Sequence, residues 1–216
     1  MTVRPSFSRS LRRLADDTMR GLALVLVRIF FRRVETEHGE RLPEHGPVLV
    51  VANHTNGLVD GLLLMATLRR YPRFLGKSTL FKIPPLWPFL KLAGVIPVYR
   101  AADGGPTERN ASAFATSDRL LARQGVVAIF PEGISHDESA LQPLRTGAAR
   151  IALEAAIGSD VPDVAIAAVG LLYDDKATFR SRALVRIGEP SDVSPWGELY
   201  RQDGREAVRQ LTDAVA

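Results

Sequence analysis

The chain has 216 residues, 46% of them hydrophobic and 24% charged, which is the composition of a single globular domain with a sizeable core. It contains no cysteine, so disulfides, thiolate zinc sites and a cysteine nucleophile are excluded. The net charge of +4 is uneven, because residues 1–33 hold eight arginines and two aspartates while the rest of the chain is slightly acidic. This distribution argues against a nucleic-acid-binding body and indicates an N-terminal arm that is attracted to anionic surfaces.

The arm contains an apolar run from Gly21 to Phe31 that is interrupted only by Arg28. This run is too short to cross a bilayer, which takes about 20 residues. A secretory signal would need a small-residue cleavage site after the run, where Arg32 and Arg33 stand instead. We therefore predict that residues 1–33 form a basic amphipathic arm, peripheral or monotopic on the cytoplasmic face of a membrane. The alternative is an ordinary N-terminal helix packed on the domain.

Residues 34–46 are polar and contain Gly39, Pro43 and Gly46, which is typical of a connecting loop. Apolar runs then alternate with amphipathic or alanine-rich segments. Strands are predicted at 48–51, 74–78, 94–99, 126–130, 164–172 and 183–187, and helices from about 58, at 107–124, at 146–157 and from 196 onward. This alternation predicts an α/β domain over residues 34–216, with a mostly parallel sheet covered by helices on both faces.

The first of these strands is followed at its carboxyl end by Asn53 and His54, and Asp60 comes six residues after the histidine. Open α/β sheets place their sites at the carboxyl ends of strands. An imidazole is suited to accept a proton near neutral pH, and a carboxylate bonded to its second nitrogen would fix the tautomer. His54 and Asp60 are therefore the candidate catalytic pair, with a structural histidine and a helix-capping aspartate as the alternative.

Charged residues also follow other predicted strands. Lys77 and Arg100 each end a strand, and the loop from Glu132 to Asp137 follows another. Cations that converge on a histidine at a sheet edge indicate a phosphate-bearing substrate. Lys77, beside a glycine at the end of an apolar strand, is the first candidate for a phosphate ligand.

Four blocks of the sequence resemble, in the same order, blocks of the glycerophospholipid acyltransferases. They are NHTNGLVD (53–60), GVIPVYR (94–100), FPEGISHD (130–137) and VAIAAVGLLY (164–173), and the resemblance covers residues 47–190. It implies direct acyl transfer, in which His54 takes the proton of an acceptor hydroxyl that attacks an acyl thioester, while Asp60 orients the imidazole. The donor would be acyl-CoA or acyl-carrier protein, with no cofactor and no metal. The residues expected to bind substrate are Lys77, Arg100, Glu132, Gly133, Ser135, His136 and Arg145.

Two blocks depart from the commonest form of the family. Five residues rather than four separate His54 from Asp60, and Ser135 stands where most members have an arginine that helps to hold the acceptor phosphate. These departures, together with the segments 142–145 and 179–182, resemble the eukaryotic glycerol-3-phosphate or dihydroxyacetone-phosphate acyltransferases. His136 and Arg145 are then the candidates to supply what the missing arginine supplies elsewhere. For His136 the alternative is a loop residue that caps the next segment.

The expected function is that of a membrane-associated O-acyltransferase of phospholipid biosynthesis. The compact length favours lysophosphatidic acid as the acceptor, giving phosphatidic acid, whereas the block departures favour glycerol 3-phosphate or dihydroxyacetone phosphate. A non-catalytic lipid-binding domain is the main alternative from another class. A hydrolase with Ser135 as nucleophile fits poorly, because the segment lacks the Gly-x-Ser-x-Gly turn. A metal site made of His54, Asp60, His136 and Asp137 is conceivable, but the resemblance implies none.

Overall fold

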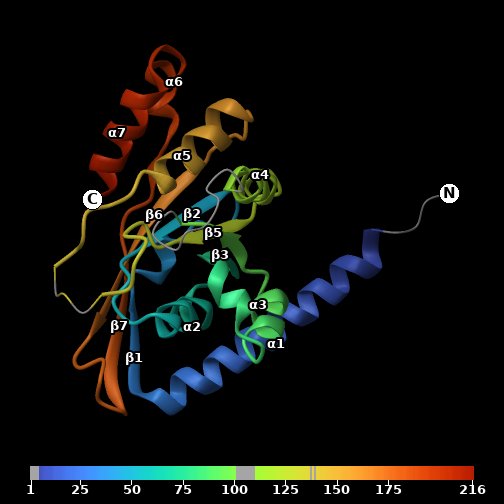
Figure 1. Ribbon diagram of the computed structural model, residues 1–216, viewed down its shortest axis with the longest axis vertical. Helices are drawn as coiled ribbons and strands as arrows, with labels where there is room; N and C mark the ends of the chain where they lie inside the picture. Colours follow the sequence, from blue (N-terminus) through green and yellow to red (C-terminus); the bar gives the residue numbers. More distant parts are fainter. Residues whose placement is uncertain (1–4, 101–109, 137, 139) are drawn as a thin grey trace.

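The structure is a computed structural model that describes residues 5–100, 110–136, 138 and 140–216 (Figure 1). The strands are β1 (Phe31–Glu37), β2 (Val48–Ala52), β3 (Pro72–Lys77), β4 (Ile96–Val98), β5 (Val126–Ile129), β6 (Ala165–Tyr173), β7 (Ser181–Ile187) and β8 (Ser191–Asp192). The α-helices are α1 (Pro5–Phe30), α2 (Leu58–Thr67), α3 (Trp87–Ala93), α4 (Asn110–Leu121), α5 (Gly147–Leu153), α6 (Gly197–Gln202) and α7 (Gly204–Val215).

The strands form one sheet with the order β1-β7-β6-β2-β5-β3-β4, and β8 pairs with the first two residues of β6. Strand β2 is parallel to both of its neighbours, β5 and β6, and β3 is parallel to β5 and β4. The pairs β6–β7 and β6–β8 are antiparallel, whereas β1 joins β7 in parallel. The prediction of a mostly parallel sheet is confirmed, and each strand predicted beyond residue 46 is present.

Strand β2 lies in the middle of the sheet and is buried on both faces. Its residues alternate between two cores, because successive side chains of a strand point to opposite faces. Val48 and Val50 pack into a core with α1, α2 and α3, whereas Leu49 and Val51 pack into a second core with α5 and α7. Figure 1 shows these two groups of helices on opposite sides of the sheet. The expected cover of helices on both faces is therefore also confirmed.

The prediction of a connecting loop over residues 34–46 is wrong at its start. Residues 31–37 form strand β1, which pairs with β7 so that Val34 lies opposite Ala183. Only Phe31 of this strand is buried, and its arginine and glutamate side chains are largely exposed, as suits the edge of a sheet. A 3₁₀ turn at Gly39–Arg41 follows. The boundary that the sequence predicts at residue 33 therefore falls inside a strand.

Helix α1 packs on the domain through one face. Met19, Ala23 and Val27 on this face are buried in the same core as β2 and α2. A second stripe of apolar side chains on α1 is exposed, and it is formed by Leu11, Leu14, Val25, Ile29 and Phe30. Helix α3, which contacts α1, exposes Trp87, Phe89 and Leu92. In the described parts of the chain, every helix is too short or too polar to cross a bilayer.

Two predicted helices differ in detail from those observed. The helix at 146–157 is α-helical only as far as Leu153 and continues as a π-helical turn over Glu154–Gly158. The C-terminal helix begins with a 3₁₀ turn and is broken at Asp203, whose side chain accepts hydrogen bonds from two backbone N–H groups and caps α7. Residues 107–109 of the helix predicted at 107–124 lie outside the described residues.

Candidate active site

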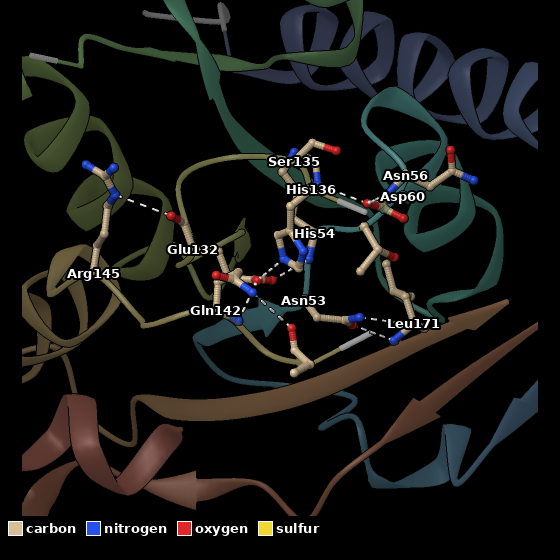
Figure 2. A network of polar contacts seen from close by, with 12 residues as sticks. Asn53, His54, Asn56, Asp60, Glu132, Ser135, His136, Gln142, Arg145 and Leu171 are labelled. Atoms are coloured by element: carbon tan, nitrogen blue, oxygen red, sulfur yellow. Dashed lines mark hydrogen bonds and ion pairs between the residues drawn. The ribbon is translucent and has the colours of Figure 1, made fainter. Parts of the chain in front are cut away.

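The turn after β2 is held against the neighbouring strand β6. The side-chain amide of Asn53 donates to the carbonyl of Leu171 over 2.9 Å, and its oxygen accepts from the N–H of Leu171 over 2.6 Å. An amide side chain that bonds to both backbone groups of one residue in this way extends the hydrogen bonding between β2 and β6 beyond the end of β2. The position of the next residue, His54, is thereby fixed at the carboxyl edge of the sheet (Figure 2).

The hydrogen bond predicted between His54 and Asp60 is present. Nδ1 of His54 lies 2.9 Å from Oδ2 of Asp60, which is in the first turn of α2 and has a fully buried side chain. The same carboxylate oxygen accepts the N–H of Asn56 over 2.8 Å. An ionised carboxylate only accepts hydrogen bonds, so Nδ1 carries the proton, and Nε2 of His54 presents its lone pair. The imidazole can therefore act as a general base through Nε2.

The other oxygen of Asp60 accepts a hydrogen bond from the hydroxyl of Tyr173, the last residue of β6. Burial raises the pKa of Tyr173 well above its usual range, and the charge of Asp60 and the hydrogen bond to it raise this pKa further. The phenol thus stays protonated and remains a donor to the carboxylate. Its ring stacks on Phe31, with 5.7 Å between the ring centroids.

Glu132 connects the loop after β5 to the turn that carries His54. Its side chain is fully buried, and Oε1 accepts the backbone N–H of His54 over 2.7 Å. Oε2 accepts the N–H of Gln142 over 3.0 Å and also bonds to Nε2 of His136. The backbone N–H of His136 in turn donates to the carbonyl of His54 over 3.2 Å. Figure 2 shows these groups gathered around the imidazole.

Two further contacts join the same loops. Oγ of Ser135 accepts the N–H of Gly57 over 3.0 Å, at a glycine whose φ of +53° strains any other residue. The amine of Lys176 donates to the carbonyls of Thr55 and His136 over 3.1 and 3.2 Å. In addition, the ring of His54 stacks on Phe130, with 4.1 Å between centroids. The imidazole is therefore held by its hydrogen bonds, its backbone and its ring face.

The predicted substrate-binding arginines contact the backbone of this loop. Arg100 donates to the carbonyl of Gly133, and Nε of Arg145 donates to the carbonyl of Glu132 over 3.3 Å. Gly133 has a φ of +71°, and a Cβ atom there would lie 2.6 Å from Nε of Arg145. Figure 2 shows Arg145 on the side of Glu132 that faces away from His54. Both arginines therefore support the loop, and their role toward a substrate stays a prediction.

Lys77 lies at the carboxyl end of β3, which is separated from β2 by β5 in the sheet. Its role as a phosphate ligand also stays a prediction. Within the described residues, no group of three or more histidine, aspartate or glutamate side chains is arranged to hold a metal ion. Asp137, which the sequence suggested for such a group, lies outside those residues.

The sequence alone did not single out Tyr173, Lys176 or Gln142 as parts of the site. A signal was available for the first of these, because Tyr173 ends the apolar run 164–173 and parallel strands end at the same edge of a sheet. What the sequence could not show is that this strand is the direct neighbour of β2. The amine of Lys176 bonds to backbone carbonyls, and Gln142 contributes its own backbone N–H. No sequence pattern marks contacts of either kind.

Comparisons with known proteins agree with this arrangement. A family model described as "Acyltransferase" matches residues 33–169. Glycerol-3-phosphate O-acyltransferase 2 of Saccharomyces cerevisiae is 41% identical over 96 residues, which are 44% of this chain and 13% of that protein. Human 1-acyl-sn-glycerol-3-phosphate acyltransferase beta is 25% identical over 159 residues, which are 72% of this chain and 54% of that protein. The chain thus spans between about an eighth and about half of the length of these curated relatives.

The fold itself has a counterpart among solved structures. The crystal structure of the 1-acyl-sn-glycerophosphate (LPA) acyltransferase PlsC from Thermotoga maritima superimposes with a TM-score of 0.68 at 18% identity. The match covers 99% of this chain and 83% of that chain, and at this identity it bears on the fold alone. The family model, in contrast, spans well over half of the sequence and includes His54, Asp60 and Glu132. The chain therefore belongs to the acyltransferase family, in agreement with its resemblance to the glycerophospholipid acyltransferases.

Proposed function

We propose that the protein transfers an acyl group from a thioester, acyl-CoA or acyl-carrier protein, to a hydroxyl of a glycerol-phosphate-type acceptor. The observation that carries this proposal is the hydrogen bond between Nδ1 of His54 and buried Asp60, which leaves Nε2 as the proton acceptor. Acyl transfer to an alcohol needs such a base, because a neutral hydroxyl is a weak nucleophile.

The proposed reaction has two proton movements. Nε2 of His54 takes the hydroxyl proton while the acceptor oxygen attacks the thioester carbonyl and forms a tetrahedral intermediate. The intermediate collapses, the C–S bond breaks, and the departing thiolate takes the proton back from the imidazolium. Asp60 stabilises the imidazolium that exists between these steps, as the acid of a catalytic triad does. The thioester is a co-substrate, and the scheme assigns no cofactor.

The identity of the acceptor is the finer part of the proposal. The compact length predicts lysophosphatidic acid, but the chain spans only part of its relatives, so length carries little weight. Glycerol-3-phosphate O-acyltransferases 1 and 2 of Saccharomyces cerevisiae are 36% and 41% identical to aligned segments of the chain, against 25% for the human 1-acylglycerol-3-phosphate enzyme. We therefore place glycerol 3-phosphate or dihydroxyacetone phosphate first and lysophosphatidic acid second, with Lys77 and Arg100 as proposed phosphate ligands.

A competition experiment tests both levels of the proposal. Glycerol 3-phosphate and lysophosphatidic acid, each with a different radiolabel, are offered at equal concentration with one acyl-CoA. We expect the glycerol 3-phosphate label to appear in lysophosphatidic acid faster than the other label appears in phosphatidic acid. The reverse order would make lysophosphatidic acid the acceptor and leave acyl transfer in place. If the mixture consumed no thioester and neither acceptor were acylated, the chain would be a lipid-binding domain rather than an enzyme.

We also propose that the protein lies on an anionic membrane surface, on the cytoplasmic face, where acyl thioesters are available. Helix α1 keeps an exposed apolar stripe after its other face is packed, and α3 beside it exposes two aromatic side chains. Large apolar side chains left exposed on two helices that contact each other are typical of an interaction site. The arginines of residues 1–33 add an attraction to anionic lipids that salt would screen.

The double variant Leu14→Ser/Phe89→Ser is expected to bind phosphatidylglycerol-containing vesicles at least about tenfold more weakly, because each side chain loses about 1 kcal/mol or more of apolar burial. Co-sedimentation at several salt concentrations measures the loss. Leu172→Ser is the matched control. Leu172 is 49% exposed, but the residue before it on the strand, Leu171, faces the core that contains α1. Leu172 therefore faces the opposite side of the sheet from α1. Equal vesicle binding by the double variant and the control would move the membrane contact to another surface.

A further inference from the structure

The carboxylate of Asp60 is held at both of its oxygens. Oδ2 accepts from His54 and from the N–H of Asn56, and Oδ1 accepts from the hydroxyl of Tyr173. The side chain of Asp60 is fully buried, so solvent cannot replace a donor that is removed. The plane of the carboxylate, and with it the direction in which the imidazole is held, therefore depends on the tyrosine.

Tyr173 is itself held rigidly at this position. It ends β6, and two residues earlier the paired amide contacts of Leu171 with Asn53 join this strand to the turn of His54. Its ring stacks on Phe31 at the start of β1. The hydroxyl thus reaches Asp60 from the end of a central strand that is fixed on both sides, and the raised pKa of Tyr173 keeps it a donor.

We infer that Tyr173 is a positioning residue of the acyl-transfer reaction, which orients the carboxylate of Asp60 and through it the imidazole of His54. The inference rests on the proposed function, because it assigns the tyrosine to the proton transfer of that reaction. Tyr173 does not contact the acceptor or the thioester in this scheme. Its contribution is made when the imidazolium forms, where the orientation of Asp60 toward the ring matters most.

This role predicts a specific kinetic pattern. A hydrogen bond to a charged group contributes about 1.5–3 kcal/mol, so its loss corresponds to about a ten- to hundredfold change in rate. Because the bond acts on the transition state and not on substrate binding, the change should fall on kcat, while KM for the donor and the acceptor stays within about twofold. A residue that only stabilised the fold would lower the amount of active protein without this split.

The test uses the full chain with the substitution Tyr173→Phe, which keeps the ring stacked on Phe31 and removes only the hydroxyl. Tyr71→Phe is the matched control, since Tyr71 is also half-buried in the same core but donates its hydroxyl to the sulfur of Met65. We expect kcat to fall about ten- to hundredfold in the first variant and to stay unchanged in the second. An unchanged kcat in Tyr173→Phe, or an equal fall in both variants, would overturn the inference.

A second readout does not depend on turnover. The Nδ1 proton of His54 can be followed by proton NMR and assigned by its absence in His54→Ala. With one donor fewer, Asp60 keeps more negative charge and becomes a stronger acceptor, so the signal should move downfield in Tyr173→Phe and not in Tyr71→Phe. If the wild type transferred no acyl group, the proposed function would fail, yet the NMR shift would still decide whether Tyr173 controls the His54–Asp60 pair. An unmoved signal would contradict that control.

Discussion

Replacing His54 with alanine is expected to lower kcat/KM for acyl transfer by about 10²–10⁴-fold, the usual effect of removing a general base. The side chain is 20% exposed at the end of a strand and contributes one stacked contact, with Phe130, to the packing of the loop. The backbone N–H that bonds to Glu132 is kept in the variant. The variant also takes one donor from the buried carboxylate of Asp60, which costs about 1–3 kcal/mol and lowers the melting temperature by roughly 2–10 °C. The main loss should still appear in the chemistry, at temperatures well below the unfolding transition.

The measurement is the initial rate of thioester consumption together with thermal unfolding of the same preparations. His45→Ala is the matched control, because His45 is an exposed histidine in the loop before β2 and lies outside the contacts of the site. Retention of most of the activity in His54→Ala would exclude His54 as the base. In that case the hydrogen bond to Asp60 would have to be read as structural.

The substitution Glu132→Gln is expected to lower both stability and activity. Three donors converge on this buried carboxylate, and they come from His54, His136 and Gln142. A carboxamide has one accepting oxygen, and its NH₂ group would face a donor. Each buried donor left without a partner costs about 1–3 kcal/mol, which in a domain of this size lowers the melting temperature by roughly 2–10 °C. A shift of the His54 backbone would reduce kcat by a further factor of about ten or more.

Thermal unfolding and kcat are measured on the same variant, so that the two effects can be compared. Glu154→Gln provides the control, because Glu154 is exposed and its side chain accepts the hydroxyl of Tyr200 over 2.8 Å, a hydrogen bond that a glutamine oxygen can also accept. An unchanged melting temperature in Glu132→Gln would mean that the donors find other partners. The view of Glu132 as the group that joins the two loops would then be wrong.

The parts of the fold that the sequence predicted correctly are those with a local signal. Strand β2 is a continuous apolar run rich in valine, and His54 and Asp60 lie within six residues of each other, so their contact requires only one turn of chain. Strand β1 has no such signal, because its exposed edge positions are arginine and glutamate. It exists through its pairing with β7, near the other end of the chain. Propensity and periodicity cannot reveal a strand of this kind.

The same limit applies to the site. The sequence could place strand ends at one edge of a sheet, but not the order of the strands along it, and Tyr173 is part of the site because β6 lies directly beside β2. The resemblance to known acyltransferases drew attention to Glu132, yet its bonds to two backbone N–H groups follow only from the folded loops.

Removing residues 1–33 would also take Phe31 from the core, which is why the membrane contact is better tested with point variants.

The pairing of β1 with β7 has a consequence for synthesis of the protein. Phe31 lies opposite Ser181, about 150 residues later in the chain, and at about 5–20 residues per second the ribosome needs roughly 8–30 s to make the intervening part. For most of that interval helix α1 has been made, but the sheet that later covers Met19, Ala23 and Val27 is incomplete. Both of its apolar faces are then available to a bilayer. Insertion into lipid and docking onto the domain are therefore expected to compete for one helix in the nascent chain, and the outcome depends on how soon a membrane is within reach.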